Sequence, residues 1–225
     1  SGRLGNGSTD NQSTPVTVSG ISTATSVSTW GDHTCAPLSD GTIKCWGEGT
    51  DGKLGNGSTD NQSTPVTVSG ITTATSVSVG GSHSCALLSD GTIKCWGYGH
   101  VGSLGNGSND NQTTPVNVSG ITTATSVSAG WLHTCALLSD GTIKCWGSYL
   151  YGCLGIGLTT SNKNTPETVK NIRTATSVSA GLFTTCALLS DGSIKCWGES
   201  RMGSLGNGIV GVNFWAPDSV KGLID

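Results

Sequence analysis

The segment HSCALLSDGTIKCW, residues 83–96, reads as two short strands joined by a tight turn. Residues 83–88 and residues 92–96 have the length and the β-branched or apolar character of strands, and an Asp-Gly pair between such runs is a hairpin signal. The connection Ser89-Asp90-Gly91 suits a type I turn that ends with glycine in the left-handed region. The segment therefore predicts an antiparallel hairpin of defined register.

That register brings two cysteines together. With a three-residue connection, Leu87 faces Ile93, and Cys85 faces Cys95 as a non-hydrogen-bonded pair, in which the Cα atoms approach to about 4.5 Å. This separation is within disulfide range. A zinc site fits poorly, because a Cys-x9-Cys hairpin leaves too few ligands close together. We therefore predict one disulfide in each copy of the segment: Cys35–Cys45, Cys85–Cys95, Cys135–Cys145 and Cys186–Cys196.

The hairpin belongs to a repeat. The string IKCWG begins at Ile43, Ile93, Ile143 and Ile194, so the period is 50 or 51 residues. In each unit a strand such as residues 74–79 precedes the hairpin, and a loop with an outer strand, such as residues 103–118 with Pro115 at the strand's start, follows it. Helical periodicity is absent, so the repeat predicts an all-β fold of β-propeller blades, each with four antiparallel strands.

The repeat also divides the chain. We expect an outer-strand segment of a preceding or closing blade over 1–20, and four blades over 21–70, 71–120, 121–171 and 172–225.

The composition excludes several classes of function. A net charge of −3 gives no electrostatic footprint for nucleic acid. No apolar run approaches the roughly 18 residues of a membrane span, so we expect no membrane insertion. The chain starts at Ser1 without a signal-peptide pattern, and any targeting segment is expected to be removed or to lie outside this sequence. Paired cysteines are typical of oxidising compartments, which favours a secreted protein or an extracellular surface.

The unit HTCALLSDGTIKCWG, residues 133–147, is followed in other units by Gly-x-Leu-Gly-Asn-Gly. It resembles the repeat of the regulator of chromosome condensation family, and the paired cysteines are similar to those of its secreted bacterial members. The resemblance implies a β-propeller, usually of seven blades. The family includes nucleotide exchange factors for a small GTPase, secreted β-lactamase inhibitors and surface proteins. Four units leave three arrangements open: an excerpt of a longer array, a ring shared with a second chain, or a four-bladed ring.

The repeats differ from one another mainly in two loops. These are the A–B loop between the first and second strands and the C–D loop between the third and fourth, which a meander places at the same end of the blade. Loops on a rigid scaffold often carry binding residues, and Trp, Tyr and Arg are frequent hot-spot types. We therefore predict a partner-binding rim, the alternative being drift in unconstrained loops: Trp30, Asp32, Tyr98, His100, Trp131, Leu132, Tyr149, Tyr151, Phe183, Arg201 and Met202.

The remaining candidates are few. Cys153 has no partner in its unit and stands in a variable loop, which predicts an intermolecular disulfide, a bond to a missing neighbour or a free surface thiol. His33, His83 and His133 recur at a strand start and are expected to be structural hydrogen-bonding groups beneath the A–B loop. We expect no catalytic residues, no metal and no cofactor, because no nucleophile, base and orienting group recur at suitable spacing.

These observations favour a secreted or cell-surface module that binds a protein or a glycan. A structural role in a stalk, filament or multi-chain assembly, with self-association or continuation into further blades, is the alternative. A nucleotide exchange factor is less favoured, because small GTPases do not occur in an oxidising compartment.

Overall fold

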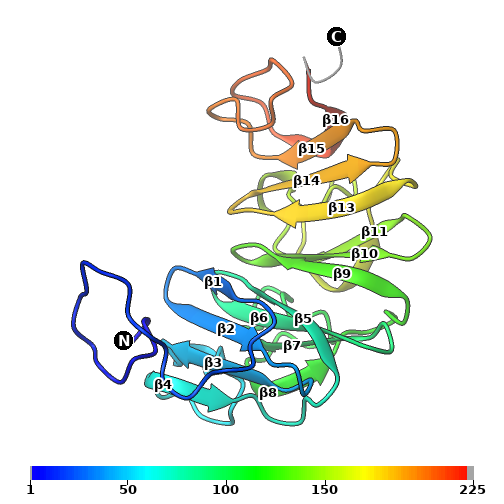
Figure 1. Ribbon diagram of the computed structural model, residues 1–225. Coiled ribbons are helices and arrows are strands. Elements are labelled where there is room, and N and C mark those ends of the chain that lie inside the picture. The colour runs from blue at the N-terminus through cyan, green and yellow to red at the C-terminus, as the bar shows by residue number, and fades with distance from the viewer. Residues whose placement is uncertain (1, 222–225) are drawn as a thin grey trace.

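The computed structural model describes residues 2–221 and is built from four antiparallel sheets of four strands each. Within each sheet the strands pair in chain order, which confirms the predicted meander. Figure 1 shows the sheets following one another along the chain, with the C-terminal sheet, in orange, at the top.

We call the sheets blades 1 to 4. Their strands are, for blade 1, β1 (Ser28–Trp30), β2 (His33–Pro37), β3 (Ile43–Gly47) and β4 (Gln62–Thr67); for blade 2, β5 (Ala74–Val79), β6 (His83–Leu88), β7 (Ile93–Gly97) and β8 (Gln112–Asn117); for blade 3, β9 (Ala124–Ala129), β10 (His133–Leu138), β11 (Ile143–Gly147) and β12 (Lys163–Thr168); for blade 4, β13 (Ala175–Ala180), β14 (Thr184–Leu189), β15 (Ile194–Gly198) and β16 (Phe214–Ser219).

The central hairpin has the predicted register. Cys85 pairs with Cys95 and Leu87 with Ile93, and the Leu88 amide donates to the Thr92 carbonyl at 2.9 Å across the turn. Gly91 has φ +79°, the left-handed conformation that this turn requires. The other three blades repeat the cysteine pairing opposite one another.

All four predicted disulfides are present. In each the Cα atoms lie 4.1 Å apart, as expected for a non-hydrogen-bonded pair. Each bridge lies inside one blade between the second and third strands, and its cysteines are buried except for Cys186, which is partly exposed. In the chain-entropy model a short loop of this kind stabilises a fold by about 2–3 kcal/mol.

The core lies between blades rather than within them. One buried cluster joins Ile93 and Leu104 from the blade 2 repeat to Ala136 and Trp146 of blade 3, and equivalent clusters lie at the other two junctions. The second strand of each blade contacts the first strand of the next, through β2–β5, β6–β9 and β10–β13. A sheet with one buried face needs such a neighbour, so each blade depends on the blade beside it.

The outer strands differ in detail from the prediction. Pro115 is the fourth residue of β8 and not its start, and the pairing with β7 is interrupted between Cys95 and Gly97. A proline has no amide hydrogen to donate, so it is tolerated at an edge strand where the ladder already has a bulge.

The outer strand expected within residues 1–20 is not formed in the described part, residues 2–20. The segment lies beside the C–D side of blade 1, where the Arg3 carbonyl accepts a hydrogen bond from Trp46 Nε1 at 3.0 Å. The outer strand of a blade forms by hydrogen bonding to the third strand of the same blade. Among residues 2–221, no such strand pairs with this segment.

Candidate functional site

The two variable loops of each blade meet at one end of the sheet, as the meander requires. They are hydrogen-bonded to each other at their bases: in blade 2 the Tyr98 amide donates to the Ser82 carbonyl at 3.0 Å, and in blade 4 the Glu199 amide donates to the Phe183 carbonyl at 3.0 Å. The B–C turns lie at the opposite end of the sheet. We call the end that carries the A–B and C–D loops the variable rim.

The residues predicted for this rim are all accessible to some degree. His100, Arg201 and Met202 are exposed, and Met202 is 95% accessible. The others are partly buried: Trp30, Asp32, Tyr98, Trp131, Leu132, Tyr149, Tyr151 and Phe183. Partial burial fixes a side chain in place while leaving part of its surface to a ligand, and their role in binding remains a prediction.

Four of these residues form one cluster at the junction of blades 3 and 4. The ring of Phe183 is in edge contact with Trp131, at 5.0 Å between centroids, and with Tyr151, at 4.8 Å. The guanidinium of Arg201 lies over the Tyr151 ring, 5.2 Å from its centroid, which is a cation–π distance. The four side chains come from four different loops, two of blade 3 and two of blade 4. We call Trp131, Tyr151, Phe183 and Arg201 the blade 3–4 cluster.

The backbone holds this cluster in place. The Trp131 amide donates to the Gly181 carbonyl at 3.1 Å, which ties the A–B loops of blades 3 and 4 together. The indole lies against Gly81 of blade 2, where a Cβ would come within 2.2 Å of Trp131 Cδ1. Tyr151 has φ +57° within the short 3₁₀ turn η2 (Leu150–Gly152). A non-glycine residue in this region costs about 1–2 kcal/mol, and the equivalent residue of blade 1, Asp51, adopts the same conformation with φ +61°, so the turn is a recurring feature of the C–D loop.

The structure does not bring the rim residues of blades 1 and 2 into this cluster. Asp32 forms an ion pair with Arg3, with 2.5 Å between the carboxylate oxygen and the guanidinium nitrogen. The ring of Tyr98 is in edge contact with the ring of His100, with 5.1 Å between their centroids. Tyr149 packs beneath the rim against the core between blades 3 and 4. The sequence placed these residues at one end of the fold, but only the structure separates them into a cluster and isolated pairs.

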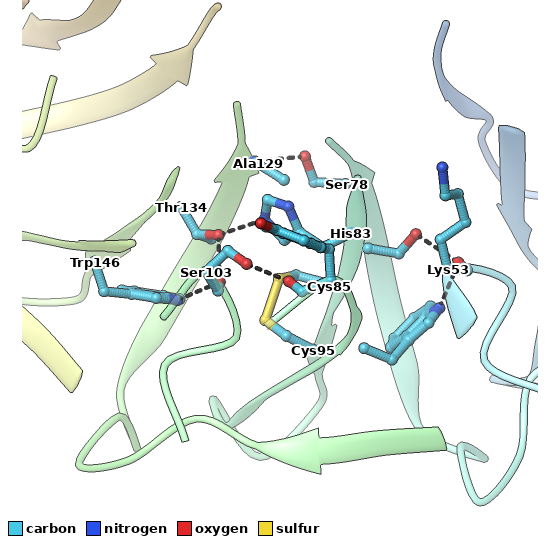
Figure 2. The surroundings of a disulfide bond; sticks show 12 residues. Lys53, Ser78, His83, Cys85, Cys95, Ser103, Ala129, Thr134 and Trp146 are labelled. Atoms are coloured by element: carbon cyan, nitrogen blue, oxygen red, sulfur yellow. Dashed lines mark hydrogen bonds between the residues drawn. A yellow bond between two sulfur atoms is a disulfide. The ribbon is translucent and has the colours of Figure 1, made fainter. Parts of the chain in front are cut away.

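Beneath the rim runs a line of hydrogen bonds from blade to blade (Figure 2). The Nε2 of His83 lies 2.7 Å from the Thr134 hydroxyl of the next blade, and that hydroxyl donates to the Ser103 carbonyl at 3.0 Å. The same carbonyl accepts from Trp146 Nε1 at 2.9 Å. Since the threonine hydroxyl donates its only proton to the carbonyl, the histidine must carry its proton on Nε2. We call this arrangement the histidine relay.

The histidine relay recurs at all three junctions between the four blades. The Nε2 of His33 lies 2.8 Å from the Ser84 hydroxyl, and that hydroxyl donates to the Lys53 carbonyl. The Nε2 of His133 lies 2.9 Å from the Thr185 hydroxyl, which donates to the Cys153 carbonyl. The prediction of structural hydrogen-bonding histidines is confirmed. Their hydroxyl partners were missed, although a Ser or Thr one residue after each of these positions repeats in every unit: Thr34, Ser84, Thr134 and Thr185.

The relay histidines are neutral. Burial lowers the pKa of His33 and His83 to about 3 and that of His133 to about 4, because a charged imidazolium would lose its hydration. Lys53 and His83 lower the pKa of His33 further. The Nδ1 atoms of His33 and His83 are buried and have no hydrogen-bond partner among residues 2–221, so a second proton would find no acceptor there.

The expectation of a surface thiol at Cys153 is wrong. Cys153 is 1% accessible, and its thiol donates to the Ser148 carbonyl at 3.1 Å. It occupies the position of Lys53 and Ser103, where the backbone carbonyl receives the relay hydroxyl and the tryptophan Nε1 of the next blade. Burial raises the pKa of this thiol to about 12. A thiol in this position cannot reach another chain without opening the junction.

A thiol-labelling experiment tests these cysteine assignments together. Iodoacetamide should label none of the nine cysteines in the folded, unreduced protein, and Cys153 alone after denaturation without reductant, because only the thiolate reacts and the folded site keeps it protonated and covered. Intact mass and peptide mapping measure the number and position of labels. Rapid native labelling at Cys153 would contradict its burial, and labelling at Cys85 or Cys95 would contradict the disulfide.

Among residues 2–221, no three His, Cys, Asp or Glu side chains are grouped so that they could hold a metal ion. In the same part of the chain, no helix has the length and apolar character needed to cross a bilayer.

Solved structures with the same architecture include human WBSCR16, which is 24% identical with a TM-score of 0.79, over 88% of this chain and 53% of that one. Yeast RCC1 (Prp20), solved in complex with Kap60, is 21% identical with a TM-score of 0.83, over 94% and 52%. The ectodomain of the receptor kinase CR4 from Physcomitrella patens is 26% identical with a TM-score of 0.51, over 79% and 41%. This chain thus spans about half the length of the first two, and at these identities they show a shared fold.

A search of curated proteins finds no match. The family model described as the regulator of chromosome condensation (RCC1) repeat matches residues 40–87, 90–137 and 140–188, and a second model of the same repeat matches residues 74–103, 124–153 and 175–204. The matches run through all four blades and contain the four disulfide hairpins in whole or in part. The chain therefore belongs to the regulator of chromosome condensation repeat family.

Proposed function

We propose that this chain is an extracellular protein-interaction module that binds its partner through the variable rim. The observation that carries the proposal is the contrast within each repeat, where the strands and turns are nearly constant and the loops at one end are not. Those loops hold the blade 3–4 cluster, in which aromatic rings and an arginine are fixed against one another. Residues of these types dominate the binding energy of most protein interfaces.

The surroundings of the cluster favour a protein over a glycan. The same loops expose Leu150 at 39%, Leu182 at 51% and Met202 at 95% accessibility. Methionine, arginine and aromatic residues are enriched at the centre of protein interfaces, where charged side chains other than arginine are depleted. The structures of yeast Prp20 concern binding to Kap60 and to Gsp1p and histones, so propellers of this architecture do serve as protein-binding scaffolds.

The disulfides support the extracellular part of the proposal. The chain has four bridges, one in each blade, and disulfides persist in oxidising surroundings and are rare in the cytosol.

A site-specific photo-cross-linking experiment tests the binding rim. Benzoylphenylalanine placed at His100, Leu182 or Met202 should capture a partner from the extracellular fluid of the source, because these exposed side chains lie on the variable rim. The matched controls are Ser89, Ser139 and Ser190, which are equally exposed in the B–C turns at the opposite end. Adducts are measured by gel shift and mass spectrometry. Equal or stronger cross-linking from the three serines would reject the rim as the binding surface.

A further inference from the structure

The charge that the blade 3–4 cluster presents to solvent is positive. The Arg201 side chain is 67% accessible, whereas the side chain of Glu199, its ion-pair partner at 3.2 Å, is 21% accessible. An anionic group approaching this part of the rim therefore meets the guanidinium before it meets the carboxylate.

Arg201 is held in a defined orientation. Its Nε is the atom that pairs with Glu199, and its Cζ lies over the Tyr151 ring, 5.2 Å from the centroid. Within the described residues the two terminal nitrogens of the guanidinium have no protein partner. A guanidinium fixed in this way presents a planar pair of donors, which matches the two oxygens of a carboxylate.

Apolar surface lies directly beside this donor pair. Phe183 contacts both Tyr151 and Trp131, so the arginine stands at one end of a continuous row of aromatic rings. Leu182 adjoins Phe183 in the chain and Met202 adjoins Arg201, and both are more than half exposed. The site thus combines one carboxylate-binding group with an apolar shelf and offers few polar groups that could satisfy the hydroxyls of a sugar.

We propose that the blade 3–4 cluster recognises a protein segment that presents an Asp or Glu carboxylate next to an apolar side chain. The carboxylate pairs with the terminal nitrogens of Arg201, and the apolar side chain packs on Phe183 and Trp131. This inference rests on the proposed binding role of the rim and adds the chemistry of the partner. The ring of Tyr151 supports the guanidinium of Arg201 in this arrangement.

Selection of displayed random peptides on the intact, oxidised chain tests the proposal. Enriched peptides should share an acidic residue beside an aromatic or aliphatic one, and binding should fall by about ten- to hundredfold for Arg201→Gln, the usual loss for a hydrogen bond to a charged group. Arg201→Lys should lose part of this affinity, since it keeps the charge but not the planar donor pair. Tyr151→Asn tolerates the left-handed backbone and removes only the ring, so it should weaken binding as well.

The outcomes separate the two proposals. Two results would overturn this inference and still leave the rim as the binding surface. In the first, the enriched peptides lose affinity for a Phe183→Ala variant but carry no acidic residue. In the second, they lose affinity for Phe183→Ala but bind Arg201→Gln unchanged. Peptides unaffected by any rim substitution would overturn both. An oligogalacturonate that binds in an Arg201-dependent manner, with no peptide enriched, would make the partner an acidic glycan and also overturn the inference. Because Arg201 is exposed, unchanged thermal unfolding of Arg201→Gln and Arg201→Lys serves as the folding control.

Discussion

Acidification should destabilise this fold steeply between pH 6.5 and pH 4.5. In the unfolded chain the three relay histidines titrate near their ordinary pKa of 6.5, whereas in the folded protein His33 and His83 protonate only near pH 3 and His133 near pH 4. Below pH 6.5 the unfolded state therefore binds protons that the folded state excludes, and the free energy of unfolding decreases as the pH falls. Each histidine contributes up to about 1.4 kcal/mol per pH unit, so three together approach about 4 kcal/mol per pH unit.

Urea unfolding at a series of pH values measures this slope. The measurements should be made above pH 4.5. Hydrogen bonds from Thr92 and its equivalents lower the pKa of Asp90 and the other turn aspartates, so these aspartates change the free energy of unfolding only at lower pH. His83→Thr, which copies the residue at Thr184 in blade 4, should reduce the slope by about one third. His100→Gln removes an exposed histidine and should leave the slope unchanged. A flat profile from pH 6.5 to pH 5 would show that the histidines are not held neutral.

Trp146→Ala should cost about 3–5 kcal/mol of unfolding free energy, the range for truncating a large buried aromatic side chain. The indole is fully buried between blades 2 and 3, where it packs with Ile93 and Leu104 and donates to the Ser103 carbonyl. The ring fills its site closely, since a Cβ on Gly105 would lie 2.6 Å from Trp146 Nε1, so removal of the indole leaves a large cavity at the junction.

The measurement is the midpoint and slope of chemical denaturation for the single variant. Trp131→Ala is the matched control, because this indole is only partly buried in a rim loop and its loss should cost much less. A loss below about 1.5 kcal/mol for Trp146→Ala would mean that the tryptophan does not lock the junction.

Local chemistry explains why so much of the fold could be predicted from the sequence. The turn Ser89-Asp90-Gly91 sets the register of the hairpin, and the register alone places Cys85 opposite Cys95. The repeat then carries the same result to the other blades. A repeat period of about fifty residues, without any helical pattern, is sufficient to predict a meander of four strands in each unit.

The recurring tryptophans at the ends of the third strands indicate packing between blades, but which polar and rim side chains meet across a junction could not be predicted from the sequence. His83 and Thr134 are 51 residues apart, and their meeting depends on how one sheet is rotated against the next. The same rotation buries Cys153, which the sequence shows only as an unpaired residue in a variable loop. Tyr151, Phe183 and Arg201 likewise meet only because blades 3 and 4 bring their loops together.

The position of the disulfides determines how the molecule responds to mechanical load. Each bridge closes a hairpin within one blade, so across residues 2–221 only the main chain links one blade covalently to the next. Tension along the chain cannot extend the cross-linked hairpins, so it acts on noncovalent contacts, among them the histidine relay and the tryptophan packing at the junctions. The blade 3–4 cluster is built from loops on both sides of one junction. Tension that separates those two blades therefore takes the cluster apart.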